Sequence, residues 1–490
     1  MTLLIFTGYS GFTNRTHSIS RLISKEFQEL KISKIVFGKH NFKFLKEQKE
    51  VNYEKIVNVE EEQENILKKN KDYSEEEIEK IEKFIGTSLT RLAYSERTFV
   101  RHTHDMEYSG KISHRDIINF TCALIENIDQ IVKGKKIIFV YTCASIVSEI
   151  LYFLSIKYQI KFYTLTEVRM ITGFFLADNN KEYISEIFDR FDEAKVSNDG
   201  LDLYNDYLER IKKSEQNLVH NQHIKRVHST KRVTAKNIFR FIKNFILDPE
   251  THFMSPTRFQ RLKFNIMHYI RLYYQNKNSQ DFLPKNKYVY YPLATIPEAS
   301  TLIRGIDFFD ELSNVKLISL NIPINYKLVV KLHPNMKGRN TIKFLKDLNK
   351  IFNVHVVNYS VLSNEILKNA ECVITASGTT GLESLALGKK TVIIGHPSYG
   401  YLKSCFKINS FSELGNIMKL KWSNSLIDKQ IEEVKIYASQ ISGNYMIKDK
   451  DGVIWNVKPK AFTNQTIDFD LNFYNIFLSL IHISEPTRPY

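Results

Sequence analysis

Short polar motifs follow apolar runs in the second half of the chain, at positions suited to binding an anionic ligand. His333 and Pro334 come directly after the apolar run Tyr326–Leu332. An imidazole at a strand end can donate a hydrogen bond to a phosphate oxygen, and Pro334 fixes the turn that aims it. Lys331 lies within the run, and Arg339 follows in a loop that could reach an anion. The competing interpretations are a structural or merely exposed His333 and a solvated Lys331.

A second motif, TASGTTGLES at residues 375–384, lies between an apolar run and a helical pattern. The first amides of a helix are unpaired and, together with the helix dipole, favour an anion. Glu383 could instead hold a sugar or ribose hydroxyl from the first turn. Ordinary capping, with Glu383 completing a box from Thr380, is compatible with anion binding. The residues that can add hydroxyl donors or let the backbone approach a ligand are Ser377, Gly378, Thr379 and Thr380.

Two further motifs have the same character. The sequence GHPSYG at Gly395–Gly400 follows another apolar run, and Glu298 lies just before a helical pattern. Each motif is a weak signal when taken alone. Because the carboxyl ends of parallel strands meet at one edge of a sheet, we expect all four motifs to converge there.

Alternating apolar runs and amphipathic stretches predict the elements that position these motifs. A linker containing Pro284 and Asn286 precedes the alternation, and one helix is predicted over Leu302–Leu320. Strands that alternate with helices specify a parallel sheet. The predicted strands of this half are Tyr288–Tyr291, Tyr326–Leu332, Val354–Val357, Cys372–Thr375 and Thr391–Ile394.

The first half of the chain begins in the same way. A strand pattern over Leu3–Phe6 runs into the turn TGYSG, and a helical pattern then leads to a strand at Ile32–Phe37. These glycines do not form a full GxGxxG, so a dinucleotide-binding fingerprint is not supported. Further strands are predicted over Lys136–Tyr141 and Ile160–Leu165. The sequence therefore predicts an α/β fold with two Rossmann-like doubly wound domains and a basic helical insertion between them.

The motifs resemble those of a known family. YYPLATIPEAS, VVKLHP and TASGTTGLESLALGKKTVIIGHPSYG look like the carboxyl-terminal half of bacterial capsule polysaccharide biosynthesis proteins, over about Tyr288–Tyr401. FTGYSG resembles the opening strand and loop of that family more weakly. The resemblance implies the GT-B fold of glycosyltransferases, including capsule Kdo transferases, and a nucleotide-sugar donor that is often a CMP-sugar. It also implies that Pro334 shapes a turn and that the donor is bound by His333, Ser377, Gly378, Thr379 and Glu383.

The catalytic group is less well marked. Glycosyl transfer needs a base for the acceptor hydroxyl or a nucleophile that holds the sugar. The densest polar group of the first half, Glu96–Asp105, offers Asp105 and His104, and Glu298 is a third candidate. A structural loop of paired charges is the competing interpretation of that group, and Glu167 with Arg169 is another candidate pair. A metal site would need a further ligand group beside His102, His104 and Asp105, and the spacing places none there. We therefore expect a metal-independent enzyme without cofactors.

The net charge of +15 over 490 residues is unevenly distributed. Residues 211–280 hold 14 Lys and Arg against 3 Asp and Glu, which is +11 of the total. A basic amphipathic segment fits a solvated helical connector, an anionic membrane surface or, least well, a nucleic acid. No nucleic-acid-binding signature accompanies the charge, so we expect no nucleic-acid partner.

Composition also indicates where in the cell the protein is located. Four cysteines without CxxC spacing, no apolar run near 20 residues and no signal-peptide pattern predict a cytoplasmic protein. The basic segment leaves open a peripheral position on the inner face of the plasma membrane. The final sequence LSLIHISEPTRPY resembles a translated sequencing-library adapter and is expected not to belong to the protein. The predicted parts are an acceptor-side domain 1–200, a basic connector 201–283, a nucleotide-sugar domain 284–425, an extension 426–477 and the adapter-like tail 478–490.

Together these features predict a glycosyltransferase that moves a sugar from a nucleotide donor to a glycan or lipid-linked acceptor. Three alternatives remain open at this stage. They are a CDP-alditol phosphotransferase, a sugar-nucleotide epimerase and a non-catalytic partner in capsule assembly.

Overall fold

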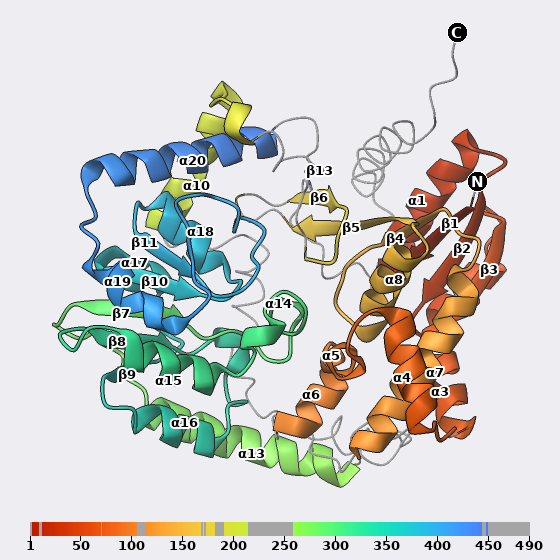
Figure 1. Cartoon of the computed structure of the whole chain (residues 1–490), viewed down its shortest axis with the longest axis horizontal. Coiled ribbons are helices and arrows are strands. Elements are labelled where there is room, and N and C mark those ends of the chain that lie inside the picture. The colour runs from red at the N-terminus through yellow and green to blue at the C-terminus, as the bar shows by residue number, and fades with distance from the viewer. Residues whose placement is uncertain are drawn as a thin grey trace, which may run out of the picture. The chain divides into compact units, whose positions relative to one another are not determined.

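The computed structural model describes residues 2–8, 12–69, 71–104, 113–167, 170, 173–181, 191–213, 258–442 and 447–448. The chain divides into two compact units (Figure 1). The first unit comprises residues 1–95, 115–207 and 435–490, and the second comprises 96–114 and 208–434. The domain boundaries expected from the sequence stay predictions.

The first unit is built on a seven-stranded sheet in the order β13-β6-β5-β4-β1-β2-β3. The strands from β5 to β3 are parallel, whereas β6 pairs antiparallel with β5 and β13 pairs antiparallel with β6. The strands are β1 (Thr2–Phe6), β2 (Lys31–Val36), β3 (Tyr53–Asn58), β4 (Ile137–Val140), β5 (Lys161–Glu167), β6 (Gly173–Ala177) and β13 (Ile447–Lys448). The helices are α1 (Thr13–Glu26), α2 (Lys39–Glu47), α3 (Val59–Lys69), α4 (Glu75–Ile85), α5 (Leu89–Tyr94), α7 (His114–Val132) and α8 (Ile146–Lys157).

The second unit contains a six-stranded, fully parallel sheet in the order β12-β11-β10-β7-β8-β9. Numbered along the chain, these strands lie in the 3-2-1-4-5-6 order of a doubly wound fold. The strands are β7 (Tyr288–Pro292), β8 (Lys327–Lys331), β9 (Val354–Val357), β10 (Cys372–Thr375), β11 (Lys390–Ile393) and β12 (Phe406–Lys407). The helices are α6 (Arg97–His104), α13 (Arg258–Lys277), α14 (Ala299–Leu302), α15 (Glu311–Asn321), α16 (Ile342–Asn349), α17 (Ser363–Asn369), α18 (Thr379–Ala386) and α19 (Leu414–Lys419). Two further helices, α10 (Asn198–Lys212) and α20 (Asn424–Ser442), have residues in both units.

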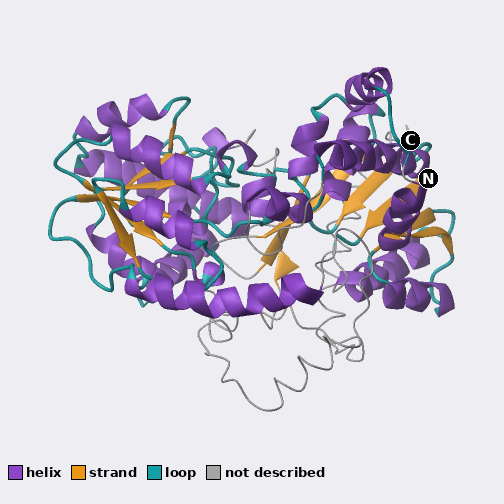
Figure 2. Cartoon of the chain, turned by 90° about the horizontal axis from the view of Figure 1, so that it is seen from below, coloured by secondary structure: helices purple, strands orange, loops and turns teal. Residues whose placement is uncertain are grey.

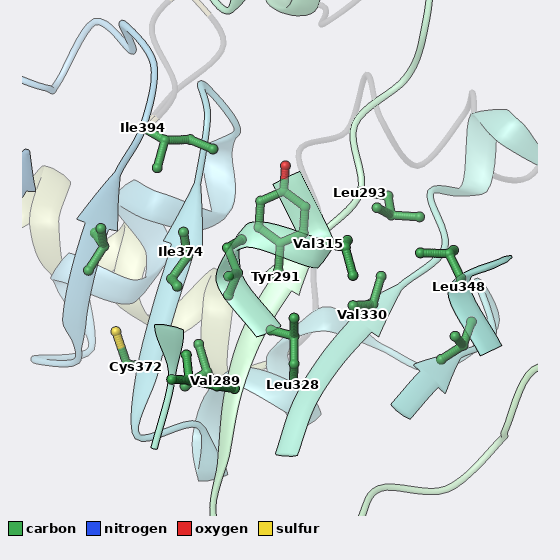
Figure 3. Close-up of a cluster of buried hydrophobic side chains, with 14 of the residues drawn as sticks. Val289, Tyr291, Leu293, Val315, Leu328, Val330, Leu348, Cys372, Ile374 and Ile394 are labelled. Atoms are coloured by element: carbon green, nitrogen blue, oxygen red, sulfur yellow. The ribbon is translucent and has the colours of Figure 1, made fainter. Parts of the chain in front are cut away.

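Each face of the second sheet packs against helices, because the strands are apolar on both sides. Val289 and Tyr291 point to a cluster that includes Leu328 and Val330 (Figure 3). The alternate residues of the same strands form a second cluster with helix α17 on the opposite face. Figure 2 shows the helices above and below the strands of this unit. Burial on both faces explains the continuous apolar runs of the sequence.

The α/β fold with two Rossmann-like units is confirmed, and most predicted strands agree with the structure to within two residues. The predicted helix Leu302–Leu320 is wrong, because α14 ends at Leu302 and α15 begins only at Glu311. The side chain of Asp310 accepts hydrogen bonds from the amides of Leu312 and Ser313, and this cap starts a separate helix.

Strand β3 was not predicted. It lies inside the stretch Lys43–Lys83, whose richness in Lys and Glu indicates a solvated helix when the sequence is considered alone. β3 is an edge strand beside β2, and of its residues only Val57 and Asn58 are buried. Its sequence therefore shows little alternation of apolar and polar residues. Helix α4 begins with a capping box, in which Ser74 and Glu77 each bond to the other's backbone amide. Within the described residues, no helix is long and apolar enough to cross a membrane.

Candidate active site at the carboxyl edge of the second sheet

The order of the strands defines where a ligand would meet the second sheet. β7 and β10 are neighbours, and the chain proceeds from β7 to one side of the sheet and from β10 to the other. Open α/β sheets bind ligands outside the carboxyl ends of the strands at such a switch point. The loops that follow β7 and β10 therefore flank the expected ligand position.

The loop after β7 is joined by hydrogen bonds to the loops after three other strands. The hydroxyl of Thr295 lies 2.9 Å from Nδ1 of His333, after β8. The hydroxyl of Ser377, after β10, donates to the carbonyl of Ser300 at 2.7 Å. The amide of His396, after β11, donates to the carbonyl of Arg304 at 3.2 Å. The structure thus brings the four sequence motifs together at one edge.

His333 has a defined tautomer when it is neutral. The backbone amide of Asn335 donates to its Nδ1 at 3.1 Å, so Nδ1 is an acceptor. The proton of the neutral ring is therefore on Nε2, which can act as a donor. Pro334 occupies the first position of the short 3-10 helix η4 (Pro334–Met336), as expected for a turn-forming residue.

The motif at residues 375–384 folds differently from the expected capping box. Gly378 is the residue before α18, and no side chain caps this helix, so the proposed box from Thr380 is wrong. The Glu383 side chain is instead hydrogen-bonded to Thr379. The amide of Gly378 donates to Thr375 Oγ1 at 3.1 Å, and the hydroxyl of Tyr399 donates to the carbonyl of Gly378. Thr380 and Ser377 are both nearly buried, at 9% and 8% exposure.

Lys331 and Glu383 form the charged part of this edge. Lys331 is only 6% exposed and its Nζ donates to Ser363 Oγ at 3.0 Å, so the interpretation as a solvated lysine is wrong. Burial lowers the pKa of Lys331 to about 8, while the negative charge of Glu383 opposes that change. Burial raises the pKa of the half-buried Glu383 to about 6, against the effects of Lys331 and Thr379. Each group favours the charged form of the other, because their charges are opposite.

The remaining candidates lie in different places. Glu298 is on the β7 loop, where its Oε2 accepts a hydrogen bond from Ser300 at 3.0 Å. Arg339 follows η4, and its carbonyl accepts from Arg271 at 3.4 Å. Asp105 and Arg169 lie outside the described residues, and only the backbone of His104 and Glu167 is described. In the described part of the chain, no three His, Cys, Asp or Glu side chains gather as metal ligands would.

Glu311 is a buried carboxyl that the sequence analysis missed. Its Oε1 accepts from the amide of Ala294 at 2.7 Å, and its Oε2 accepts from the hydroxyl of Tyr291 at 2.6 Å. These bonds hold the first residues of the β7 loop, next to Thr295, which contacts His333. In the sequence Glu311 is one more acid in the first turn of a helix, and only the tertiary fold buries it.

A second unpredicted carboxyl lies in the first unit. Glu149, in the first turns of α8, is 8% exposed and its Oε2 accepts from Asn180 Nδ2 at 2.8 Å. Burial raises the pKa of Glu149 to about 7, an effect opposed by Asn180 and by the charges of Arg91 and Lys181. The loop that leads into α8 follows β4, so this carboxyl lies toward the carboxyl edge of the first sheet.

Glu311 should make the stability of the second unit depend on pH. Burial raises its pKa from 4.5 to about 7, so the folded chain binds a proton more tightly than the unfolded chain. The contribution to stability is complete below the unfolded pKa and is lost as the pH rises through 7; over this window it amounts to about 3 kcal/mol. We expect Glu311→Gln, which cannot ionise, to weaken the fall in unfolding free energy between pH 5 and pH 8, as measured by urea denaturation. The exposed Glu365→Gln serves as the control, and an unchanged slope in Glu311→Gln would contradict the prediction.

Comparison with known proteins supports the resemblance expected from the sequence. Residues 285–402 match the family model described as capsule polysaccharide biosynthesis protein. The resemblance is therefore confirmed over this segment, which contains β7 to β11 and the four connected loops. No significant match to a curated protein was found.

Solved structures give only distant similarity. A Thermosulfurimonas dismutans structure, KpsC beta Kdo 2,7 transferase, has a TM-score of 0.33 and 13% identity, covering 75% of this chain and 91% of that chain. UDP-GlcNAc 2-epimerase from Neisseria meningitidis, bound to UDP-GlcNAc, has a TM-score of 0.29 and 11% identity, covering 90% of this chain and 98% of that chain. Similarities of this size carry no argument about what this chain does.

Proposed function

We propose that this protein is a glycosyltransferase of the GT-B type, which moves a sugar from a nucleotide-sugar donor to a capsule or surface glycan or glycolipid acceptor. One observation carries the proposal. The segment that matches the capsule polysaccharide biosynthesis family is the same segment whose four loops are joined at the switch point of the sheet. A CMP-sugar is the donor class that the sequence resemblance favours.

In this proposal, the carboxyl edge of the second sheet binds the phosphate of the donor. Nε2 of His333 donates to a phosphate oxygen, because Nδ1 is already an acceptor for Asn335. The amino terminus of α18, after Ser377 and Gly378, faces the same group, and Lys331 adds positive charge from within the sheet. These fixed dipoles and charges stabilise the negative charge that develops on the leaving nucleotide.

We further propose that transfer needs no metal ion, because side chains and amides of the chain itself supply the positive electrostatic environment. The candidates for the residue that activates the acceptor hydroxyl are Asp105, His104 and Glu298. Of these three, Glu298 lies on the loop that contacts both His333 and Ser377 through its neighbours. Full activity in the presence of EDTA is the expected result, and a loss restored by Mg²⁺ would overturn metal independence.

Binding of CMP, UDP and GDP by calorimetry, followed by product analysis with the preferred sugar nucleotide, tests the function. We expect binding of one nucleotide, and release of that nucleotide with transfer of the sugar. Release of CMP with a phosphoalditol product would assign a phosphotransferase, and conversion of the donor without an acceptor would assign an epimerase. Binding without turnover would favour a non-catalytic partner in capsule assembly.

A matched pair of lysine variants locates the nucleotide site. Lys331→Met removes the buried cation but keeps much of its volume, so we expect nucleotide affinity to fall by about tenfold or more. Lys287→Met removes an exposed lysine that lies before β7, where it pairs with Glu371. This control should leave the affinity unchanged. Equal affinities for the two variants would place the nucleotide elsewhere.

A further inference from the structure

Helix α13 has one face that is fixed to the second unit. Leu272 and Tyr274 pack against the main apolar cluster of that unit. Gln275 is fully buried, and its side-chain oxygen accepts from the amide of Gly338 at 2.9 Å. His268 lies so close to Gly338 that a Cβ on this glycine would be 2.6 Å from the imidazole. The inner face therefore holds the helix firmly in place.

The opposite face of α13 exposes large apolar side chains. Ile266 is 54% exposed, Ile270 is 47% exposed and Tyr273 is 71% exposed. Their spacing of four and then three residues places them on one side of the helix. Phe259, seven residues before Ile266, continues this row at 76% exposure, and Tyr269 lies beside it. We call Ile266, Tyr269, Ile270 and Tyr273 the α13 stripe.

Helix α13 carries a large share of the exposed apolar side chains. Five of the 13 exposed large hydrophobic side chains of the described residues belong to α13. Single exposed apolar residues are common on protein surfaces, but a contiguous row indicates an interaction surface. A surface that covers this row must therefore offer apolar groups to it.

The charges of α13 indicate what kind of partner this is. The helix contains five basic residues and no acidic residue. Residues 211–257, directly before it, add nine basic residues and three acidic ones. A helix whose own charged residues are all basic and which carries an apolar row with aromatic residues is typical of a helix that lies in the interface of an anionic bilayer. A protein groove would also accept the apolar row, but it does not explain why α13 itself carries basic residues and no acidic ones.

We propose that α13 docks the second unit on an anionic lipid bilayer. The 20-residue helix is about 30 Å long and would lie along the surface, with the α13 stripe at the boundary between headgroups and acyl chains. The flanking basic side chains, such as Lys263 and Lys277, would meet lipid phosphates.

Membrane docking would also orient the candidate site. The inner face of α13 contacts the loop that follows η4, through Gln275 to Gly338 and through Arg271 to the carbonyl of Arg339. This loop continues directly from His333 and Pro334. The bilayer would thus hold the donor-binding unit where lipid-linked acceptors reside. This consequence rests on the proposed function, whereas bilayer binding itself does not.

Co-sedimentation of the full chain with vesicles tests the proposal. Phosphatidylcholine vesicles with and without phosphatidylglycerol are compared at low and high salt. We expect binding only to the anionic vesicles, weakened by salt. The triple variant Ile266→Ser, Ile270→Ser, Tyr273→Ser should bind them at least about tenfold more weakly. The charge variant Lys263→Gln, Lys277→Gln should also bind more weakly at low salt.

Matched controls come from the same unit. Leu320, Ile324 and Phe352 are 79%, 83% and 81% exposed and lie outside α13. Their triple serine variant should bind vesicles like the unchanged protein, and so should Lys316→Gln with Lys419→Gln. Equal losses in the control and stripe variants, or no preference of the unchanged protein for anionic vesicles, would overturn the proposal.

Two further readouts separate this inference from its rivals. Self-association in sedimentation velocity that the stripe variant abolishes, without vesicle binding, would assign the stripe to a second copy of the chain and overturn the proposal. Nucleotide binding by the stripe variant should be unchanged, because the stripe lies outside the donor site. Vesicle binding without any nucleotide binding would keep the membrane inference and reject the proposed function.

Discussion

Replacing His333 with alanine is expected to remove glycosyl transfer while the fold remains intact. The variant loses the Nε2 donor that we assign to the phosphate of the leaving nucleotide, and loss of one such donor typically lowers kcat about a hundredfold to a thousandfold. It also loses the Nδ1 acceptor of Asn335, which should cost about 1 kcal/mol of stability. Steady-state transfer and urea denaturation measure the two effects separately.

The variant His333→Asn distinguishes the two roles of this ring. An asparagine oxygen can replace Nδ1 as the acceptor for the amide of Asn335, but it offers no donor at the position of Nε2. We therefore expect His333→Asn to have the stability of the unchanged protein and the activity of His333→Ala. Full turnover by either variant would contradict the assignment of His333. Restored activity in His333→Asn alone would show that the histidine only shapes the turn.

Replacing Gly395 with alanine should have the largest effect on the structure of the site. An added Cβ would lie 2.6 Å from the carbonyl oxygen of Ala376 and 3.0 Å from its carbonyl carbon. Both atoms belong to the backbone of Ala376, directly after β10. The neighbouring carbonyl of Thr375 accepts from the amide of Ile394, so this backbone cannot move aside alone. We expect a loss of about 3 kcal/mol in unfolding free energy. Nucleotide affinity should fall with it, because the loop that contains Ser377 must shift.

Gly415→Ala is the matched control for this overpacking. Gly415 lies in α19, and the atom nearest to an added Cβ is the carbonyl oxygen of Asn321 at 3.6 Å, an ordinary contact. Alanine in a helix lowers the entropy of the unfolded chain, so we expect a gain of about 0.5 kcal/mol. Urea denaturation and nucleotide titration of both variants check these expectations. Unchanged stability of Gly395→Ala would show that the two loops are not packed as described.

The predicted elements agree with the structure where the pattern of apolar residues is strong. Strands buried on both faces, such as β7, β8 and β10, appear in the sequence as short continuous apolar runs between helical patterns. β3 was missed because an edge strand with mainly exposed residues has no such pattern. The helix expected over Leu302–Leu320 was wrong because Asp310 starts a new helix through its own side chain.

The residues of the candidate site also divide into those that the sequence pattern predicts and those that it does not. His333, Ser377 and His396 were found because each directly follows a predicted strand, and parallel strands bring their carboxyl ends to one edge. Glu311 and Glu149 were missed because neither belongs to a motif. Their importance arises from burial and from hydrogen bonds to Ala294 and Asn180, which are distant in the sequence.

The sequence by itself determined the alternation of strands and helices, the motifs at the strand ends and the concentration of positive charge before residue 280. These are local properties, because apolar periodicity and residue type can be read over a few positions. Only the tertiary structure decided which loops touch, since Thr295 and His333 are 38 positions apart and Ser300 and Ser377 are 77 apart. It alone also decided that Lys331 is buried beside Ser363, and that α13 turns Ile266, Ile270 and Tyr273 toward the solvent. The physical reason is that burial and hydrogen bonding depend on every neighbour in space, most of which lie far away along the chain.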